Sequence, residues 1–344
     1  MDLAAITPAA LLAIPVDQPE RLFSGPDAVA EEFKALAKRM HPDRGGSDAA
    51  FAHLNVLWQA GKERVAKGAW TIPGLAVFQG ANGHEYRVRH VRKFDAGMGQ
   101  GYIGAKSTVA YLFPAEVDDL VQVAAARVSK LGYADSNMRD KMKGRLPGVA
   151  TCQKVDGGTL LVMERDRETI RLRDLLEQQG GKLDPRHVAW IMSDLYSTAC
   201  YLGWAGLTHN DLSLDSIFVN ARMHTVCVVG GWWHSSLVGQ RMARRQAART
   251  VSNAPRKVLA DKIAIHATDL TLIRLIGREL LGDPSGSRLP TDKSVPKPLA
   301  DWLRLASGSA ALPEYRDWGR VLEASFGPRR FTELAVTFSD VYGG

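Results

Sequence analysis

Cysteine is scarce in this 344-residue sequence, which has only Cys152, Cys200 and Cys227. An odd number of widely spaced cysteines excludes a disulfide framework, offers no metal-ligand spacing and favours a reducing compartment. Long apolar runs are also missing, and none could cross a bilayer. The apolar start carries Asp2 and is interrupted by two prolines, so it is unlike a signal peptide. We therefore expect a cytoplasmic protein with no membrane partner.

Internal repeats and low-complexity tracts are absent as well. With 45% hydrophobic and 24% charged residues, the chain can bury one large core or two smaller ones, and we expect two domains. The formal net charge of +7 permits anionic partners without requiring nucleic acid.

Residues 24–68 have the pattern of two helices joined by a polar loop. Ser24, with Asp27 three positions later, is typical of a helix cap, and apolar residues then recur every 3.6 residues up to Met40. A residue that precedes proline is disfavoured in a helix, so this first helix should end before His41.

Ser47 offers a cap for the second helix, and Gly68 a natural end. The apolar stripe between them consists of Phe51, Leu54, Trp58, Gly61 and Val65. Two such stripes joined by a short loop predict an antiparallel helical hairpin.

The loop sequence "HPDRGGSDAAFAHLN", beside a basic helix face, resembles the J domain of the DnaJ-type co-chaperones. The resemblance implies that the loop docks on a DnaK-type chaperone and triggers its ATP hydrolysis. The residues that it assigns to this contact are His41, Pro42, Asp43, Lys34, Lys38, Arg39 and Arg44. The simpler alternative is a surface histidine followed by a helix-ending proline. The usual first helix is reduced to "PERLFS", and no glycine/phenylalanine linker or zinc module follows, so client binding through those modules is not implied.

From about Trp70 the pattern changes to short segments rich in β-branched and aromatic residues, which predict antiparallel strands: "HEYRVRHVRKF", "YIGAK", "STVAYLF" and "GTLLVMER". Beyond residue 168 the periodicity is helical. One helix should begin at Asp184-Pro185 and run toward Gly206, and another should include Leu270 to Leu280.

The segment "GLTHNDLSLDSIFVN", residues 206–220, lies between a long helix and an apolar strand, and it resembles the catalytic loop of protein kinases and related small-molecule kinases. The likeness covers about residues 75–335. Together with the J-domain resemblance, it implies an α+β fold of three parts: a helical-hairpin J domain (1–69), a kinase-like small lobe with an antiparallel sheet (70–167) and a helical large lobe (168–344). It also implies that Asp211 is the catalytic base, and that His209 and Asp269 anchor the loop.

Much of the kinase chemistry is missing. Phosphoryl transfer needs metal ligands and a phosphate-binding lysine, but the resemblance places Ser216, Gly230 or Gly231, and Leu112 at those positions. Alanines 124–126 lie where a partner glutamate would be sought. We therefore expect a pseudokinase with no metal and without ATP and magnesium, although residual catalysis through Asp211 stays open.

Two further features have open alternatives. The glycines of "GMGQGYIG" match a nucleotide-covering loop or an ordinary hairpin, and the short distance to the next strand favours the hairpin: Gly99, Gly101 and Gly104. No acidic residue lies between His234 and Val258, where arginines recur at helical spacing: Arg241, Arg244, Arg245 and Arg249. These arginines predict either one positive face for phosphate, RNA or acidic protein, or a solvated helix face.

The sequence therefore favours a J-domain co-chaperone that stimulates a DnaK-type chaperone, with a degenerate kinase-like domain that recognises an unidentified client protein. One alternative is an atypical protein or small-molecule kinase using Asp211. Another is an adaptor that binds phosphate or nucleic acid through the arginine stretch at 241–257, although nucleic acid is not favoured because aromatic residues are not interleaved there.

Overall fold

The computed structural model describes residues 6–44, 46–67, 70 and 74–343. Its contacts divide the chain into two compact units. Unit 1 comprises Met1–Val77 with Arg87–Arg89, and unit 2 comprises Phe78–Tyr86 with His90–Gly344. No helix within the described residues is long and apolar enough to cross a membrane.

Unit 1 is helical. Its elements are α1 (Pro8–Leu12), η1 (Pro19–Arg21), α2 (Val29–Met40), η2 (Pro42–Arg44) and α3 (Asp48–Ala66). Ser47 caps α3 as predicted, because its hydroxyl accepts the backbone N–H of Ala50 at 3.5 Å. The predicted cap at Ser24 is wrong: α2 begins at Val29, and Ser24 instead donates its backbone N–H to the Glu32 carboxylate at 2.8 Å.

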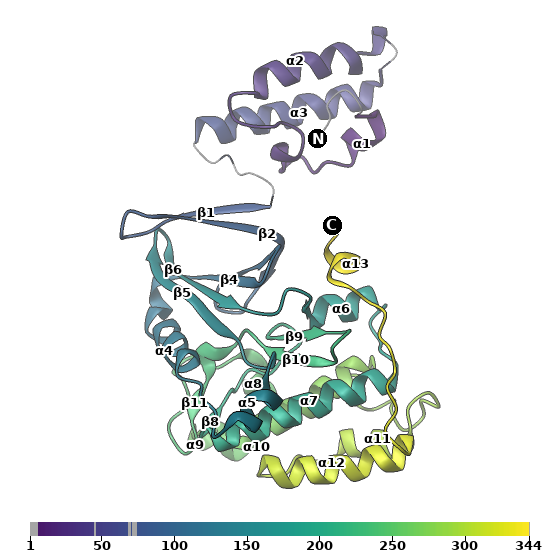
Figure 1. The fold of residues 1–344 in the computed structure, drawn as a ribbon. Coiled ribbons are helices and arrows are strands. Elements are labelled where there is room, and N and C mark those ends of the chain that lie inside the picture. Colours follow the sequence, from purple (N-terminus) through teal and green to yellow (C-terminus); the bar gives the residue numbers. More distant parts are fainter. Residues whose placement is uncertain (1–5, 45, 68–69, 71–73, 344) are drawn as a thin grey trace. The chain divides into compact units, whose positions relative to one another are not determined.

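Helices α2 and α3 pack side by side (Figure 1). Gly61, near the end of α3, lies close to Val29 at the start of α2, so the two helices run in opposite directions. Leu36 and Leu54 are fully buried between them. The predicted stripe needs two changes, since the buried Leu57 belongs to it and Val65, which is 40% exposed, does not. The expected helix end at Gly68 lies outside the described residues.

A curled antiparallel sheet has the strand order β1-β2-β3-β4-β6-β5, and most of its residues belong to unit 2. The strands are β1 (Leu75–Gln79), β2 (Glu85–Asp95), β3 (Gln100–Gly104), β4 (Thr108–Phe113), β5 (Gly148–Val155) and β6 (Gly158–Glu164). The four strands predicted from the sequence are confirmed, and β1 and β5 are additional. The short helices η3 (Ala115–Val117) and α5 (Ser136–Met142) flank α4 (Asp118–Ser129), which packs against β5 and β6.

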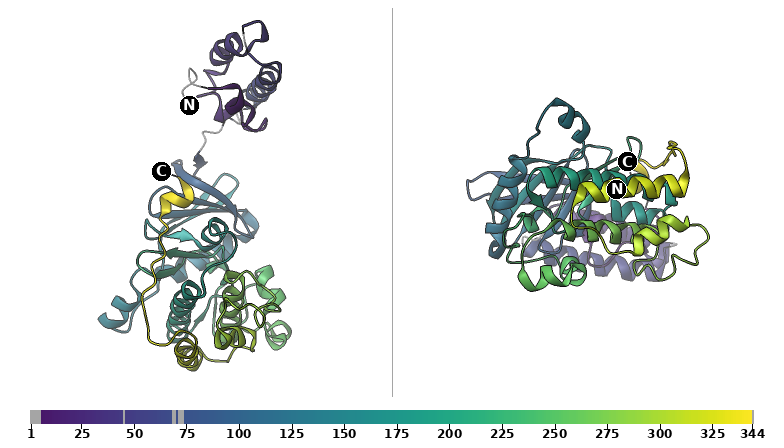
Figure 2. Two further views of the ribbon diagram at one scale, coloured as in Figure 1. Left: turned by 90° about the vertical axis from the view of Figure 1, so that its right-hand side faces the viewer. Right: turned by 90° about the horizontal axis from the view of Figure 1, so that it is seen from below.

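The rest of unit 2 is mainly helical. Helices α7 (Pro185–Trp204), α10 (His266–Leu280), α11 (Lys297–Arg304) and α12 (Ala311–Phe326) pack together (Figures 1 and 2). Smaller helices are α6 (Leu172–Gln178), η4 (Trp232–His234), α8 (Ala248–Asn253), α9 (Arg256–Asp261) and α13 (Phe338–Tyr342). Short strands are β7 (Ile170–Arg171), β8 (Leu207–Thr208), β9 (Ile217–Asn220), β10 (Thr225–Val228) and β11 (Ser236–Leu237). The two long helices predicted from the sequence are thus confirmed as α7 and α10.

Candidate functional site

The loop between α2 and α3 forms an exposed corner. His41 leaves the helix with an extended backbone (φ −68°, ψ 133°), as the following proline requires. Its ring packs edge-on against Phe51 at 5.1 Å, and its Nδ1 accepts the backbone N–H of Asp43 at 3.3 Å. The Asp43 side chain is 86% exposed. The contact with Phe51 therefore supports the corner, and the Asp43 carboxylate faces solvent.

The predicted basic residues lie on or beside α2. Lys34, Lys38 and Arg39 are exposed. Lys34 pairs with Glu31 at 3.0 Å, and Arg39 donates to the carbonyl oxygen of Ile6 at 2.9 Å. The side chain of Arg44 lies outside what the structure describes.

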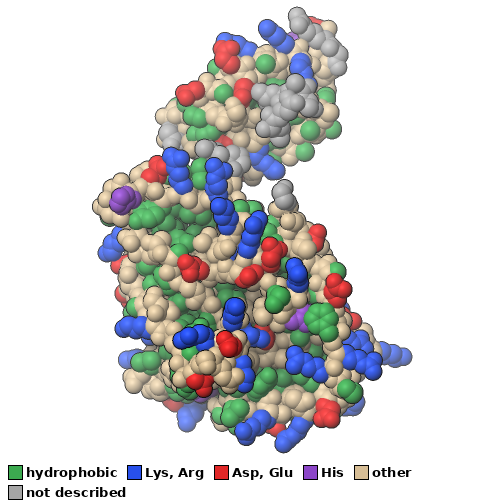
Figure 3. Space-filling view, in the orientation of Figure 1, with side chains coloured by type: hydrophobic (Ala, Val, Ile, Leu, Met, Phe, Trp, Pro, Cys, Tyr) green, Lys and Arg blue, Asp and Glu red, His purple; other side chains and the backbone are tan. Residues whose placement is uncertain are grey.

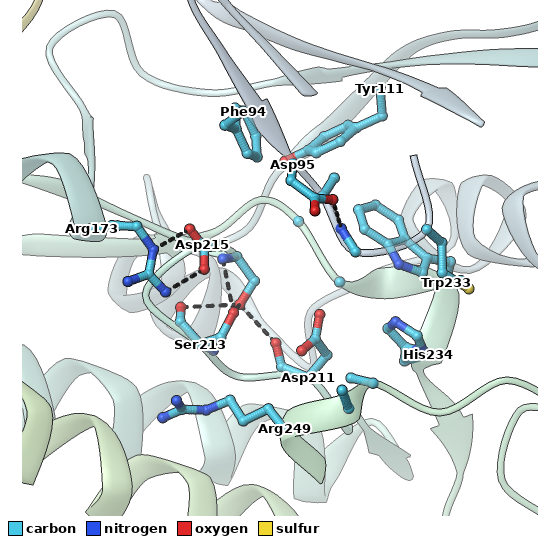
Figure 4. A pocket seen from close by; sticks show the side chains of 18 of the residues that line it. Phe94, Asp95, Tyr111, Arg173, Asp211, Ser213, Asp215, Trp233, His234 and Arg249 are labelled. Atoms are coloured by element: carbon cyan, nitrogen blue, oxygen red, sulfur yellow. Dashed lines mark hydrogen bonds and ion pairs between the residues drawn. The ribbon is translucent and has the colours of Figure 1, made fainter. Parts of the chain in front are cut away.

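A second candidate site is a cavity of about 710 Å³ in unit 2 (Figure 4). Side chains from the strands, the 209–216 loop and the segment around η4 converge on it. The lining residues used below are Arg92, Lys93, Phe94, Asp95, Tyr111, Arg171, Arg173, Asp211, Asp215, Trp233, His234 and Arg249.

The loop that carries Asp211 is fixed by buried hydrogen bonds. The Asp269 carboxylate accepts the backbone N–H groups of His209 and Asn210, each at 2.8 Å. The Nε2 atom of His209 lies 2.9 Å from the carbonyl oxygen of Gly230. Asn210 has a positive φ of 63°, a conformation that needs such fixed partners. His209 and Asp269 thus hold the loop in place.

Asp211 turns its carboxylate into the cavity (Figure 4). Burial raises the pKa of Asp211 to about 8, with Asp215 and Asp269 adding to the rise and Arg249 opposing it. A carboxyl group in this state is largely protonated at neutral pH.

The residues around Asp211 do not fit a magnesium site. A Cβ atom added at Gly231 would lie 2.9 Å from a carboxylate oxygen of Asp211 and 2.5 Å from the ring of His209, so a side chain here needs local rearrangement. The Ser216 hydroxyl donates to the carbonyl oxygen of Asp211 at 2.7 Å and fixes the loop. The Asp215 carboxylate accepts hydrogen bonds from Nε and Nη2 of Arg173, each at 2.6 Å. No group of three or more potential ligands occurs among the described residues.

The predicted lysine position needs a correction. Side chains alternate along a strand, and it is Tyr111, not Leu112, that β4 turns toward the cavity. Tyr111 is fully buried, and its hydroxyl lies 2.9 Å from where a Cβ atom of Gly230 would stand. The phenol therefore closes off the space beside Gly230.

Gly99, Gly101 and Gly104 lie in or beside β3, as the hairpin alternative expects. A Cβ atom at Gly101 would lie 2.3 Å from the Phe94 ring, and one at Gly99 would lie 2.3 Å from the carbonyl oxygen of Leu112. These glycines thus allow close packing within the sheet.

The arginine stretch is not one helical face, so that prediction is wrong. Helix α8 begins only at Ala248, and Arg241 forms an isolated β-bridge with Ile263. Arg244 pairs with Asp119 of α4, and Arg249 pairs with Glu279 of α10. Arg245 is exposed. Basic and acidic side chains are interspersed on the face of unit 2 seen in Figure 3, without a single basic field.

Several residues that line the cavity were not predicted from the sequence, among them Phe94, Tyr111, Arg171, Arg173 and Trp233. Strand alternation in "TVAYLF" was the only available indication, because it places Tyr111 and Leu112 on opposite faces. The other residues meet only through tertiary packing.

This arrangement of sheet, fixed loop and helices defines a protein-kinase-like fold. The solved kinase domain of Mycobacterium tuberculosis PknI is similar to it, with 13% sequence identity over 75% of this chain and 100% of that domain, at a TM-score of 0.50. A double mutant of that domain is also 13% identical, over 74% of this chain and 99% of its own, at a TM-score of 0.51. No protein-family profile and no curated protein matches the sequence. At this identity the likeness shows the fold alone.

Proposed function

We propose that this chain is a J-domain co-chaperone that stimulates the ATPase of a DnaK-type chaperone, with its kinase-like domain recognising a client protein. The observation that carries the proposal is the exposed His41-Pro42-Asp43 corner between two antiparallel helices. The chain itself then needs no catalytic site.

The physical basis is recognition of the partner's ATP-loaded state. The exposed side chains of Lys38 and Arg39, next to the corner, suit an acidic docking surface, and complementary charge raises the association rate. A co-chaperone that binds the hydrolysis-competent state more tightly than the resting state shifts the partner toward hydrolysis. The contacts of His41 with Phe51 and with the backbone N–H of Asp43 favour one loop conformation, which reduces the conformational freedom lost on docking.

The kinase-like domain supports a recognition role better than catalysis. Tyr111 fills the space next to Gly230, and Asp215 is already bound by arginines. The cytoplasm is the proposed location, since the three cysteines are free.

The full-length chain should raise the steady-state ATP turnover of a purified DnaK-type chaperone several-fold, and His41→Gln should return turnover to the basal rate. His84→Gln is the matched control, because it makes the same change at an exposed histidine of the β1–β2 turn. Absence of stimulation by the wild-type chain, or equal stimulation by His41→Gln, rejects the proposal.

The enzyme alternative makes a different prediction. A kinase using Asp211 would be stabilised by ATP and magnesium, because a ligand that binds only the folded state raises the melting temperature. We expect a change of less than about 1 °C at millimolar nucleotide, measured by differential scanning fluorimetry. A rise of several degrees, with phosphate transfer that is lost in Asp211→Asn, would instead establish a kinase.

A further inference from the structure

Some of the charged side chains that line the unit 2 cavity form ion pairs within the protein, and others do not. All four lining arginines are bound to carboxylates: Arg92 to Asp174 and Glu177, Arg171 to Asp174 and Asp215, Arg173 to Asp215, and Arg249 to Glu279. Lys93 is exposed, and its Nζ lies 5.6 Å from the centre of the Tyr102 ring. The four guanidinium groups thus already bind carboxylates of the protein, and a phosphate ligand would have to compete with those ion pairs.

Asp211 is the opposite case. Among the residues that the structure describes, none donates a hydrogen bond to its carboxylate or forms an ion pair with it. Figure 4 shows the Arg249 side chain directed away from it. An acidic side chain that faces a cavity and has no partner is suited to a single positive charge, because a bound cation favours its ionised form.

Aromatic and unpartnered polar groups line the same cavity as this side chain. Tyr111 and Trp233 line the cavity with ring centres 5.0 Å apart. The Tyr111 hydroxyl and the Trp233 indole N–H are buried and lack a hydrogen-bond partner within the described part of the chain. The same wall already holds a cation, since the Arg171 guanidinium lies 4.3 Å from the centre of the Phe94 ring.

We infer that the cavity of unit 2 binds a small organic ammonium group, with the Asp211 carboxylate as its counter-ion and the rings of Tyr111 and Trp233 beside it. One carboxylate and aromatic walls suit a single soft positive charge, whereas a magnesium ion needs several oxygen ligands. The ammonium group belongs either to a free amine or to a lysine side chain of a bound protein. This site is separate from the His41 corner, so each proposal can fail without the other.

Calorimetric titration of the full-length chain with choline tests the site. Choline should bind at least tenfold more tightly than 3,3-dimethylbutanol, which has the same shape without the charge. Asp211→Asn should weaken choline binding about tenfold or more, because the counter-ion is lost. Asp140→Asn removes an exposed carboxylate of α5, which does not line the cavity, and should change the affinity less than about twofold.

A second titration uses a short peptide with a single lysine. Tighter binding of the peptide than of choline supports a protein side chain as the source of the ammonium group, and the reverse order supports a free amine. The inference is overturned if neither cation binds at about 10 mM, if the neutral alcohol binds as tightly, or if Asp211→Asn leaves the affinity unchanged.

The pH dependence gives an independent readout. Choline keeps its charge at every pH, so only the protein titrates. Because burial raises the pKa of Asp211 to about 8, binding displaces a proton below that pH, and the affinity should rise roughly tenfold between pH 7 and 9. The other charged groups that act on Asp211 are Arg249 of α8, Asp215 of the same loop and Asp269 of α10.

Titration of the nearby histidines does not contribute to the expected pH dependence of choline binding. Burial lowers the pKa of His209 to about 3 and that of His234 to about 4, so both stay neutral from pH 7 to 9. Burial also raises the pKa of Tyr111 far above this range. An affinity that does not change between pH 7 and 9 contradicts the assignment of Asp211 as the counter-ion.

Discussion

Asp211→Asn should stabilise unit 2, and the gain should grow as the pH rises from about 4 to about 8. The pKa of Asp211 is about 8 in the folded protein, whereas the ordinary pKa of an aspartate, which applies to the unfolded chain, is 3.8. Between these values the folded state holds a proton that the unfolded state has lost, so wild-type stability falls as the pH rises. Asparagine does not titrate, so the difference in free energy of unfolding should widen by up to about 1.4 kcal/mol per pH unit.

Urea denaturation at about pH 5, 6.5 and 8 measures this difference, since the window follows from the two pKa values. Tryptophan fluorescence is a suitable probe because unit 2 contributes six of the eight tryptophans. Asp95→Asn is the matched control and should change the free energy of unfolding by less than about 0.5 kcal/mol at each pH. A constant difference between Asp211→Asn and wild type across this range would refute the prediction.

The expected gain bears on function. The Asp211 carboxyl group destabilises the folded state at neutral and higher pH, and no described residue forms a hydrogen bond or ion pair with it. Such a group is typical of a binding site, where function outweighs stability. The anchoring role of Asp269 is different, because its carboxylate accepts two backbone N–H groups. Asp269 therefore holds the loop in its conformation, and Asp211 faces the cavity.

Local patterns predicted much of the fold. Strand alternation and helix periodicity located β2, β3, β4, β6, α7 and α10, and Ser47 marked the start of α3. The cap at Ser24 failed because its hydroxyl, like its backbone N–H, donates to the carboxylate of Glu32, eight residues later. A pattern of three or four residues cannot reveal a partner at that separation.

The arginine stretch failed for a related reason. Helical spacing fits Arg241 to Arg249, but the carbonyl oxygen of Arg245 is held 3.0 Å from Nδ1 of His234, and Arg241 pairs with Ile263. These long-range contacts hold the segment away from helical geometry before Ala248. The cavity escaped prediction in the same way, because Phe94, Tyr111 and Trp233 come from separate elements.

Arg274→Ala should destabilise unit 2 by about 3–5 kcal/mol, the range found when one partner of a buried ion pair is removed. Arg274 of α10 is 4% exposed, and its guanidinium donates to Glu314 of α12 at 2.9 and 2.6 Å. It also donates to the carbonyl oxygen of Leu305 at 3.1 Å and lies 3.8 Å from the centre of the Trp302 ring. The substitution leaves Glu314 charged, buried and without its cation.

The same urea experiment measures this loss, with Arg320→Ala as the control, since Arg320 is 82% exposed and its ion pair with Asp317 should contribute less than about 0.5 kcal/mol. If the cost comes from the stranded carboxylate, Arg274→Ala combined with Glu314→Gln should be less destabilised than Arg274→Ala alone. The proposed stimulation of a DnaK-type chaperone provides a functional readout. The core residues Leu36 and Leu54 that support the His41 corner belong to unit 1, so stimulation should persist at urea concentrations where unit 2 of Arg274→Ala has begun to unfold. Loss of stimulation in step with the unfolding of unit 2 would show instead that the corner depends on the kinase-like domain for its activity.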